Sequence, residues 1–142
     1  MKNKKGLRII AGLGALVLII GLLILTNAFV GNPIAGAMAK NSAQKLIDKN
    51  YKDLNLKLDK PVYNFKFGEY MIEAYSESSK DTHFTIYYTR KETRDDYDYT
   101  VGDKFNTFMR LENEYSKLVK DILTNKLGYK DKNSLVTLEK GE

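Results

Sequence analysis

The sequence contains no cysteine and only one histidine, His83. The absence of cysteine excludes disulfide bridges, thiolate nucleophiles and zinc sites with cysteine ligands, so a folded domain must be stabilised by its apolar core. Because His83 is the only imidazole, any triad, general acid–base or imidazole–metal chemistry must use it. These absences argue against a catalytic or metal-dependent protein, and the sequence predicts no cofactor.

Charge is absent from a long apolar run that begins at Ile9 and ends at Val30, and no charged residue follows before Lys40. At about 1.5 Å rise per residue, a helix over residues 9–30 is about 33 Å long, enough to cross a hydrocarbon core of about 30 Å. A helix in a soluble core would have a polar face, and this run has none. We therefore predict one transmembrane helix at residues 9–30, in contact with the lipid bilayer.

The basic residues around this span predict its orientation. They are concentrated before it, and translocation of lysine and arginine across a membrane is disfavoured. We therefore expect a single-pass protein of the cell membrane, with residues 1–8 as a cytoplasmic tail and the rest extracellular. The flanking basic residues are Lys2, Lys4, Lys5 and Arg8 before the span, and Lys40 and Lys45 in the fifteen residues after it.

The main alternative is a cleaved signal peptide, which would release a secreted domain. Residues 35–37 and 37–39 each have small side chains at the first and third positions, so cleavage near Ala39 is conceivable. The apolar region of a signal peptide usually has about 7 to 15 residues, and this run is longer. The length therefore favours a retained anchor.

Small residues recur every seven positions in the span, at Gly14, Gly21 and Ala28. They would lie on one helix face and allow a weak homodimer through close helix packing. Glycine and alanine are also frequent in membrane spans generally, and there is no GxxxG motif. The homodimer is therefore the less favoured interpretation.

The outer part of the chain is nearly neutral, with 19 Lys and Arg against 18 Asp and Glu from Lys40 onward. The overall net charge of +5 thus reflects the membrane flank. Recognition of phosphate backbones requires clustered positive charge. We expect no nucleic-acid partner.

Apolar periodicity in the outer part changes from helical to alternating and back to helical. Asn32 and Pro33 predict the cap and first position of a helix that continues to about residue 50. Alternation then predicts strands, and a stripe from about residue 103 predicts a core-facing helix that Gly128 ends. The expected strands cover residues 54–67, 70–76 and 83–89, with short additional strands around residues 97–101 and 134–138.

This order predicts an α+β fold, with one N-terminal transmembrane helix followed by a small αβββα domain. We expect the domain to cover residues 31–127 as an antiparallel meander with the helices packed on one face. Residues 128–142 are then a charged C-terminal tail or the start of a further element.

His83 lies beside Asp81 and Thr82, a polar group from which a cell-envelope hydrolase could be built. Its nucleophile would have to be Ser76, Ser78 or Ser79, none of which lies in a recognisable motif. A hydrogen-bonded histidine at a strand edge is the commoner outcome. We therefore expect no catalytic residue.

Four aspartates, at positions 95, 96, 98 and 103, could offer oxygen ligands to a cation such as calcium. Their spacing does not match an EF-hand, so a solvated turn explains them better and no metal site is predicted.

Tyrosines at positions 63, 70, 75, 87 and 88 could form a binding face, although tyrosine is also common in strands. The residues that would form a polar or interaction site are Asp81, Thr82, His83, Tyr87 and Asp96.

Several stretches resemble the YfjL-like family of uncharacterised membrane-anchored proteins of Gram-positive bacteria. The resemblance extends from Met1 to about Leu127 and implies an N-terminal anchor and a small αβββα module. It brings no activity, substrate or catalytic residue, and longer members continue into a further domain where this chain ends. The stretches are Gly31-Asn32-Pro33-Ile34, Tyr63-Asn-Phe-Lys66, Ser79-Lys-Asp-Thr-His-Phe-Thr-Ile-Tyr-Tyr88, Asp95-Asp-Tyr97 and Asn106-Thr-Phe-Met-Arg-Leu-Glu-Asn-Glu-Tyr-Ser-Lys-Leu-Val119.

The sequence thus predicts a non-enzymatic binding or accessory module at the cell surface. Its expected partner is another membrane or cell-wall protein, contacted through an aromatic sheet edge. The hydrolase that uses His83 and the secreted domain remain the alternatives.

Overall fold

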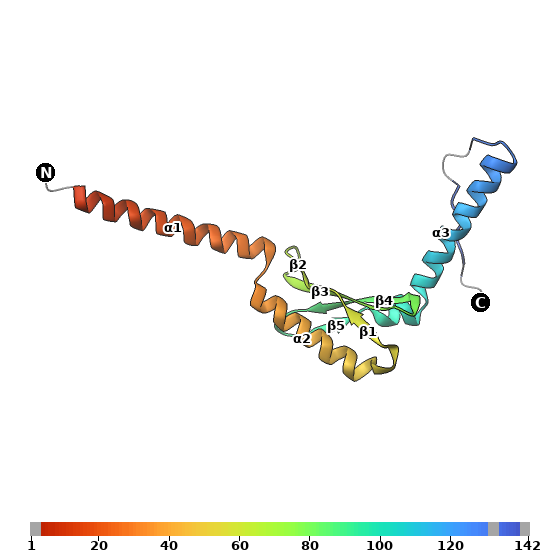
Figure 1. The fold of residues 1–142 in the computed structure, drawn as a ribbon, viewed down its shortest axis with the longest axis horizontal. Coiled ribbons are helices and arrows are strands. Elements are labelled where there is room, and N and C mark those ends of the chain that lie inside the picture. Colours follow the sequence, from red (N-terminus) through yellow and green to blue (C-terminus); the bar gives the residue numbers. More distant parts are fainter. Residues whose placement is uncertain (1–3, 131–133, 140–142) are drawn as a thin grey trace.

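The computed structural model of the chain describes residues 4–130 and 134–139. It has an α+β fold with one helix packed on the sheet and one helix projecting from each end (Figure 1). Residues 1–3 of the predicted tail and residues 131–133 and 140–142 lie outside the described residues. The elements are α1 (Lys4–Val30), α2 (Pro33–Asn50), η1 (Lys52–Leu54), β1 (Leu56–Leu58), β2 (Val62–Asn64), β3 (Glu69–Ser76), β4 (Ser79–Tyr88), β5 (Thr93–Asp95), η2 (Asp98–Gly102), α3 (Phe105–Asp121) and η3 (Ile122–Lys126).

Helix α1 has 27 residues and no buried side chain, and it projects away from the rest of the molecule (Figure 1). At about 1.5 Å per residue it is about 40 Å long. By length and composition, the described part of the chain has one helix able to span a membrane, and this helix contains α1. The predicted apolar helix is therefore confirmed, and it begins at Lys4, so that the basic residues Lys5 and Arg8 belong to its first turns.

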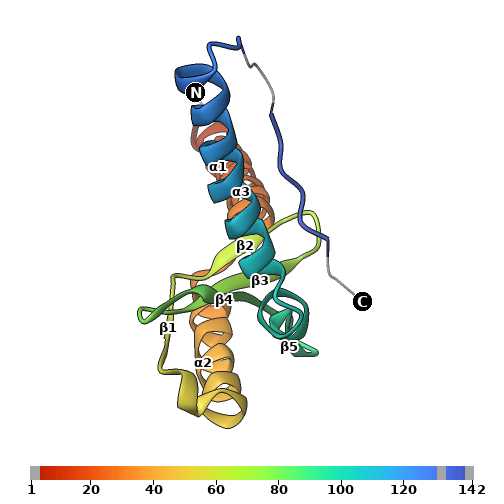
Figure 2. The same ribbon diagram turned by 90° about the vertical axis from the view of Figure 1, so that its right-hand side faces the viewer.

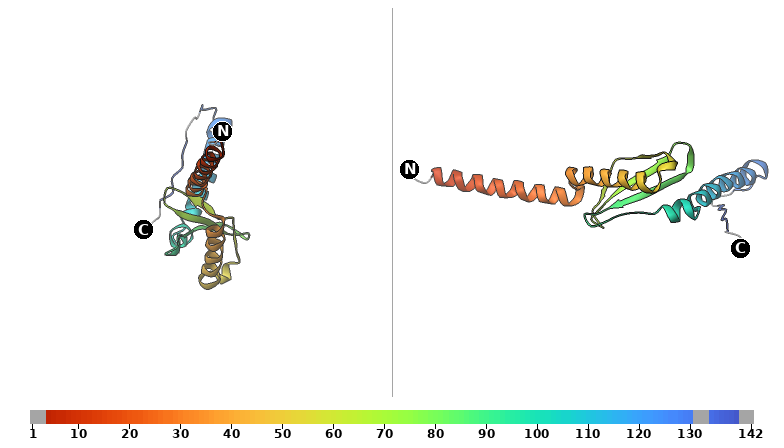
Figure 3. Two further views of the ribbon diagram at one scale, coloured as in Figure 1. Left: turned by 90° about the vertical axis from the view of Figure 1, so that its left-hand side faces the viewer. Right: turned by 90° about the horizontal axis from the view of Figure 1, so that it is seen from below.

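Helix α2 begins as predicted, because Pro33 occupies its first turn and the Asn32 side chain accepts a hydrogen bond from the Ile34 N–H at 2.8 Å. Its buried side chains are Ala39, Ala43 and Ile47. Two of these three are alanines, so the helix axis can approach the sheet closely. Figure 3 shows α2 lying along the sheet.

The sheet is antiparallel, with β3 and β4 at its centre. Strands β1 and β2 both pair with β3, along the same edge, and β5 pairs with β4 on the other side. Figure 2 shows β1 and β5 on opposite sides of the central pair. Residues 59–61, which include Pro61, separate β1 from β2, so this edge strand is broken in two.

One face of the sheet is covered by α2 and forms the core. Directly opposed pairs on β3 and β4 contribute to it, and their side chains are at most 9% exposed. The other face carries the alternate residues of the same strands and is not covered by α2. The opposed core pairs are Tyr70 with Tyr88, Ile72 with Ile86, and Ala74 with Phe84.

Helix α3 does not cover the sheet, contrary to the expectation that both helices pack on one face. The only buried residue of α3 is Asn106, and Figures 1 and 3 show the helix leaving the sheet at the end opposite α1. The face available to it is already occupied by α2, and Lys104 adopts a left-handed backbone conformation (φ 62°) that turns the chain outward. Its apolar stripe remains partly exposed, with Phe105 at 39% and Leu118 at 53%, while Phe108, Leu111 and Val119 are half-buried.

Three predicted strand segments also differ from the structure. Phe65 and Phe67 lie in the β2–β3 turn, and residues 98–102 form the helical turn η2 after the short strand β5. Residues 134–139 contain no strand. In each case a segment rich in strand-forming residues lacks a neighbouring strand with which to pair, so local preference does not decide its conformation.

Candidate functional site

The junction of α1 and α2, which we call the elbow (residues 31 and 32), is fixed to the sheet by one tyrosine. The Tyr70 hydroxyl accepts a hydrogen bond from the Asn32 N–H at 2.6 Å and donates one to the Asn32 carbonyl at 2.8 Å. Both backbone groups belong to the residue between the helices, where the helical ladder is interrupted. Strand β3 therefore fixes the angle at which α1 leaves the domain.

Gly31 is required at the elbow for two independent reasons. Its backbone φ of +81° is a conformation that residues with a Cβ rarely adopt. A Cβ at this position would also lie 2.7 Å from the Tyr63 ring and 2.7 Å from the Tyr70 hydroxyl. The two tyrosine rings pack together at 5.0 Å, so neither can easily move aside.

A cavity of about 700 Å³ opens beside the elbow. It lies between the ends of α1 and α2 and two turns of the sheet, the β2–β3 turn at residues 65–68 and the β4–β5 turn at residues 89–92. Its lining combines amide, phenol and guanidinium groups and carries both signs of charge. The lining residues are Asn27, Gly31, Asn32, Ala35, Tyr63, Gly68, Tyr70, Tyr88, Thr89, Arg90, Lys91 and Glu92.

The β2–β3 turn brings exposed aromatic residues to the end of α1. Phe65 and Phe67 are 62% and 65% exposed. The Phe65 ring lies 5.6 Å from the ring of Phe29, near the C-terminal end of α1. The Lys66 ammonium lies 5.3 Å from the centre of the Phe67 ring. This turn is thus an apolar and basic tip beside the predicted membrane span.

The uncovered face of the sheet, which we call the open face, carries half-exposed aromatic and charged residues. The Arg94 guanidinium lies over the Tyr87 ring at 4.2 Å and donates to the Glu69 carboxylate at 2.9 Å. Directly opposed across β3 and β4 are Tyr75 and His83. Such a mixture of tyrosine and arginine is typical of protein-binding surfaces.

Strand β4 places Asp81 and His83 on the same face of the sheet and Thr82 on the other, and different partners bind the two residues that share a face. The Asp81 carboxylate is bound by Arg110 of α3 through two hydrogen bonds, at 2.7 and 3.0 Å. The Thr82 hydroxyl donates to Ser79 at 2.8 Å, and successive strand residues point to opposite faces. The His83 Nδ1 lies 3.8 Å from the Glu73 carboxylate. The structure therefore pairs His83 with Glu73 and pairs Asp81 with Arg110.

The hydrogen bonds between Arg110 and Asp81 lower the pKa of the Asp81 carboxyl group. The same bonds are the main cause of a raised pKa of the Arg110 guanidinium. Asn106 adds a further contact nearby, because its amide donates to the carbonyls of Asp81 and His83 at 3.0 and 2.6 Å. These contacts join the first turns of α3 to β4. These contacts attach helix α3 to the sheet.

The aspartates considered as cation ligands bind tyrosines and backbone instead. Asp96 accepts hydrogen bonds from the Tyr87 hydroxyl at 3.0 Å and from the Thr85 N–H at 2.7 Å. Asp95 accepts one from the Tyr51 hydroxyl at 3.0 Å. Within residues 4–130 and 134–139, no group of three histidine or acidic side chains is placed to hold a metal ion.

Burial and the hydrogen bond to Asp95 raise the pKa of Tyr51, and burial and the hydrogen bond to Asp96 raise that of Tyr87. The Tyr51 ring also packs against Phe84 at 5.1 Å. Tyr51 therefore joins the end of α2 both to the core and to β5.

The sequence predicted that α2 starts at Asn32 and Pro33, but it predicted neither the contact that fixes the elbow nor the cavity beside it. Both depend on Tyr70, which lies 38 residues from its partner Asn32. One signal was present, because glycine followed by an asparagine cap and a proline predicts a sharp turn between helices. The residue that would fix this turn could not be identified from local pattern.

The chain matches the family model of the YfjL-like N-terminal domain over residues 4–99. The matched region includes α1, the elbow, the cavity lining and the sheet, whereas α3 and residues 106–119 lie beyond it. Comparison with curated proteins and with solved structures gave no match. Because the matched residues make up well over half of the chain and contain the features described above, the chain belongs to the YfjL-like family.

Proposed function

We propose that the chain is a single-pass membrane protein whose sheet domain is held at the outer membrane surface as a non-enzymatic binding or accessory module. In this proposal the open face contacts another membrane or cell-wall protein. The observation that carries the proposal is that α1, with no buried residue, joins through a fixed elbow to a domain that has its own core.

The dimensions of α1 support membrane anchoring. From Arg8, the last charged residue before the apolar run, to Phe29 there are 21 helical steps, or about 32 Å. This length matches the hydrocarbon core of a bilayer. The basic residues before the run and the near-neutral domain after it support a cytoplasmic N-terminus.

The core of the domain supports retention of the anchor. Ala39 is fully buried in the middle of α2. Cleavage near Ala39 would cut this helix and remove Asn32, which binds Tyr70. A secreted product would therefore lose contacts that stabilise the domain, which weighs against the secreted alternative.

The composition of the open face supports a binding role. It presents Tyr75 and Tyr87 with Arg94 on a rigid sheet, and these are residue types that contribute strongly to protein–protein affinity. The sheet fixes their positions before binding, so little conformational entropy is lost on association.

Membrane topology can be tested with single cysteines, because the chain contains none. A Ser78→Cys variant, in the exposed β3–β4 turn, should react with a membrane-impermeant maleimide in intact cells. A Lys5→Cys variant should react only after the cells are lysed. The opposite pattern, or a mature chain without its first forty residues, would overturn the proposal.

The binding role can be tested with a photo-crosslinking amino acid at Tyr75 and a matched control at Lys45. Lys45 lies on the exposed side of α2, away from the sheet. We expect a discrete adduct from position 75 that a Tyr87→Ser substitution abolishes, and no adduct from position 45. Equal and diffuse labelling from both positions would contradict the proposal.

The hydrolase alternative rests on His83, which is half-exposed and close to Glu73. It is less well supported, because Arg110 already binds both oxygens of Asp81. A His83→Ala variant separates the two proposals. If the cellular phenotype of a deletion is fully complemented by this variant, the hydrolase proposal is excluded.

A further inference from the structure

We propose that the β2–β3 and β4–β5 turns form a surface that docks on an anionic lipid bilayer. Phe65 and Phe67 enter the membrane interface, and Lys66, Arg90 and Lys91 contact lipid phosphates. The cavity between the two turns receives the headgroup of one anionic lipid. This inference rests on the membrane anchoring proposed above and adds a second contact between the domain and the bilayer.

The depth of the β2–β3 turn follows from α1. If Arg8 marks the inner boundary of the hydrocarbon core, Phe29 lies about 32 Å away, at the outer boundary. The Phe65 ring is in contact with the Phe29 ring, and the two ring centres are 5.6 Å apart. The turn therefore lies where the acyl chains meet the headgroups. Tryptophan and tyrosine are concentrated at this level in membrane proteins, and segments that bind the interface bury phenylalanine there as well.

The turn is preorganised rather than a loose loop. The Asn64 carbonyl accepts a hydrogen bond from the Gly68 N–H at 2.8 Å, and the Asn64 side chain accepts one from the Lys66 N–H at 3.2 Å. Gly68 has a φ of +66°, as a tight reversal requires. Two large aromatic side chains are thus held in water at the tip of a rigid hairpin. Their exposure is explained if lipid covers them.

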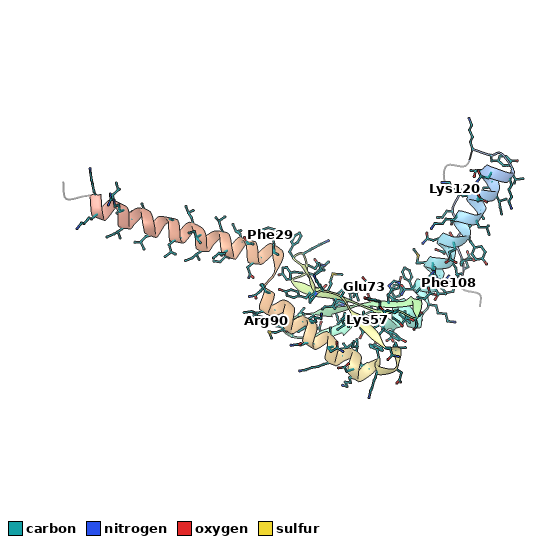
Figure 4. The ribbon with its side chains drawn as sticks, in the orientation of Figure 1. Phe29, Lys57, Glu73, Arg90, Phe108 and Lys120 are labelled. Carbon is teal, nitrogen blue, oxygen red and sulfur yellow. The ribbon has the colours of Figure 1, made fainter. Side chains whose placement is uncertain are left out.

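The second turn supplies positive charge at the same end of the domain. Figure 4 shows Arg90 and Phe29 at the elbow end, with Phe108 and Lys120 far from them. A hydrogen bond from the Thr89 N–H to the Glu92 carbonyl at 2.9 Å closes this turn. Within the described part of the chain, Arg90 and Lys91 have no ion-pair partner. Basic residues at this height are attracted to an anionic surface.

The cavity joins the two turns. Asn27 and Asn32 line it from the helices, and Arg90 and Lys91 line it from the β4–β5 turn. Amide and guanidinium groups are suitable donors to phosphate oxygens. Because Asn27 lies two helical steps, or about 3 Å, from Phe29, the cavity opens close to the boundary between acyl chains and headgroups. A lipid phosphate is therefore the occupant that its position and chemistry favour.

The absence of tryptophan from the chain gives a direct test. The Phe65→Trp variant is compared with Leu18→Trp, in the middle of α1, and Tyr75→Trp, on the open face. Each full-length variant is reconstituted in phosphatidylcholine–phosphatidylglycerol vesicles. These vesicles contain lipids brominated either near the headgroup or near the chain end, which quench tryptophan fluorescence at known depths.

We expect shallow lipids to quench Phe65→Trp, deep lipids to quench Leu18→Trp, and neither to quench Tyr75→Trp. If Leu18→Trp is quenched and Phe65→Trp behaves like Tyr75→Trp, the docking surface is overturned while the anchor stands. If Leu18→Trp is not quenched, the anchor itself fails, and the docking proposal fails with it. Unchanged thermal unfolding of Phe65→Trp would show that the fold is intact.

The contribution of charge is tested in the Phe65→Trp background. Replacing Arg90 and Lys91 with Gln should reduce shallow quenching and reverse the blue shift of the emission in vesicles that contain phosphatidylglycerol. In pure phosphatidylcholine the same change should have no effect. The matched control replaces Lys45 and Lys49 of α2 with Gln. This change should have no effect on quenching or on the emission in either kind of vesicle. Equal responses of the two double variants would overturn docking on anionic lipid.

Discussion

The Tyr70 hydroxyl binds both the N–H and the carbonyl of Asn32, at 2.6 and 2.8 Å. One side chain of the sheet therefore binds both backbone groups of a residue that lies between two helices, and the carbonyl also accepts a hydrogen bond from the Gly36 N–H at 2.9 Å. This contact couples the direction of the apolar helix α1 to the core strand β3. It also makes the elbow sensitive to the loss of a single oxygen atom.

A Tyr70→Phe substitution should lower the free energy of unfolding of the domain by about 2 kcal/mol. It removes two hydrogen bonds at about 0.5 to 1.5 kcal/mol each and leaves the partly buried Asn32 N–H without a partner, while the Asn32 carbonyl keeps its hydrogen bond from the Gly36 N–H. Urea unfolding in detergent micelles measures the change. Tyr75→Phe, on the open face, is the control and should change stability by less than about 0.5 kcal/mol. Equal losses in both variants would contradict the role of the elbow.

Gly31→Ala should destabilise the domain more than Gly68→Ala does. Both glycines have positive φ, so each substitution carries a backbone cost of about 1 to 2 kcal/mol. At Gly31 the new Cβ would also lie 2.7 Å from Tyr63 and Tyr70, whereas at Gly68 nothing lies within 4 Å. The difference between the two variants in urea unfolding therefore measures the steric term. If the two lose the same stability, the packing at the elbow is looser than the structure indicates.

Arg110→Gln should release the first turns of α3 from β4, because Arg110 is the residue that binds Asp81. Faster amide hydrogen exchange in these turns, with exchange in β3 unchanged, would report the release. Glu114→Gln is the matched control, since it removes the other carboxylate bound by Arg110 and retains the pair with Asp81. Unchanged exchange in Arg110→Gln would mean that Asn106 and Thr107 are sufficient to attach the helix.

Attachment of α3 should weaken in acid. The hydrogen bonds from Arg110 hold the pKa of Asp81 below its ordinary value, so the folded state favours the carboxylate. The resulting stabilisation is complete above about pH 4, the ordinary pKa of aspartate, and is lost as pH falls through the lower pKa of the folded state. The protection factors of the α3 amides, which remove the intrinsic pH dependence of exchange, should fall across this range in the native chain and change less in Asp81→Asn.

Alkaline pH should destabilise the domain through Tyr51. Burial and the hydrogen bond to Asp95 raise the pKa of this phenol, so the folded state favours the neutral form. The contribution is complete below about pH 10, the ordinary pKa of tyrosine, and is lost as pH rises above it. The fall in unfolding free energy between about pH 9 and pH 11 should therefore be smaller in Tyr51→Phe than in the native chain. An identical fall in both would exclude Tyr51 as the cause.

The elements that depend on local pattern were predictable from the sequence. The uncharged run around Leu18 predicted α1, and Asn32 with Pro33 predicted the start of α2. The central strands β3 and β4 followed from alternation of apolar and polar residues. In each case the signal lies within a few residues of the element it defines, so one sequence is sufficient to recognise it.

The position of α3 was not predictable, because an apolar stripe indicates that a helix face seeks a partner and does not indicate which partner. Here α2 already covers one face of the sheet, and the stripe that includes Leu118 remains partly exposed. The candidate residues around His83 show the same limit. Asp81 and His83 are neighbours in sequence, but Arg110 and Glu73, which bind or face them, are supplied by other elements.

The broken edge strand bears on how another polypeptide could associate with this sheet. Pro61 lacks an N–H and interrupts the outer row of backbone groups between β1 and β2, while β5 on the far side has only three residues. Beyond β5, the side chains of Asp96 and Asn106 bind the outer backbone of β4. Neither border therefore offers the long unpaired backbone that strand addition needs, and the sheet is protected against edge-to-edge association with its own copies. A partner that binds this sheet must therefore recognise side chains rather than extend the backbone ladder.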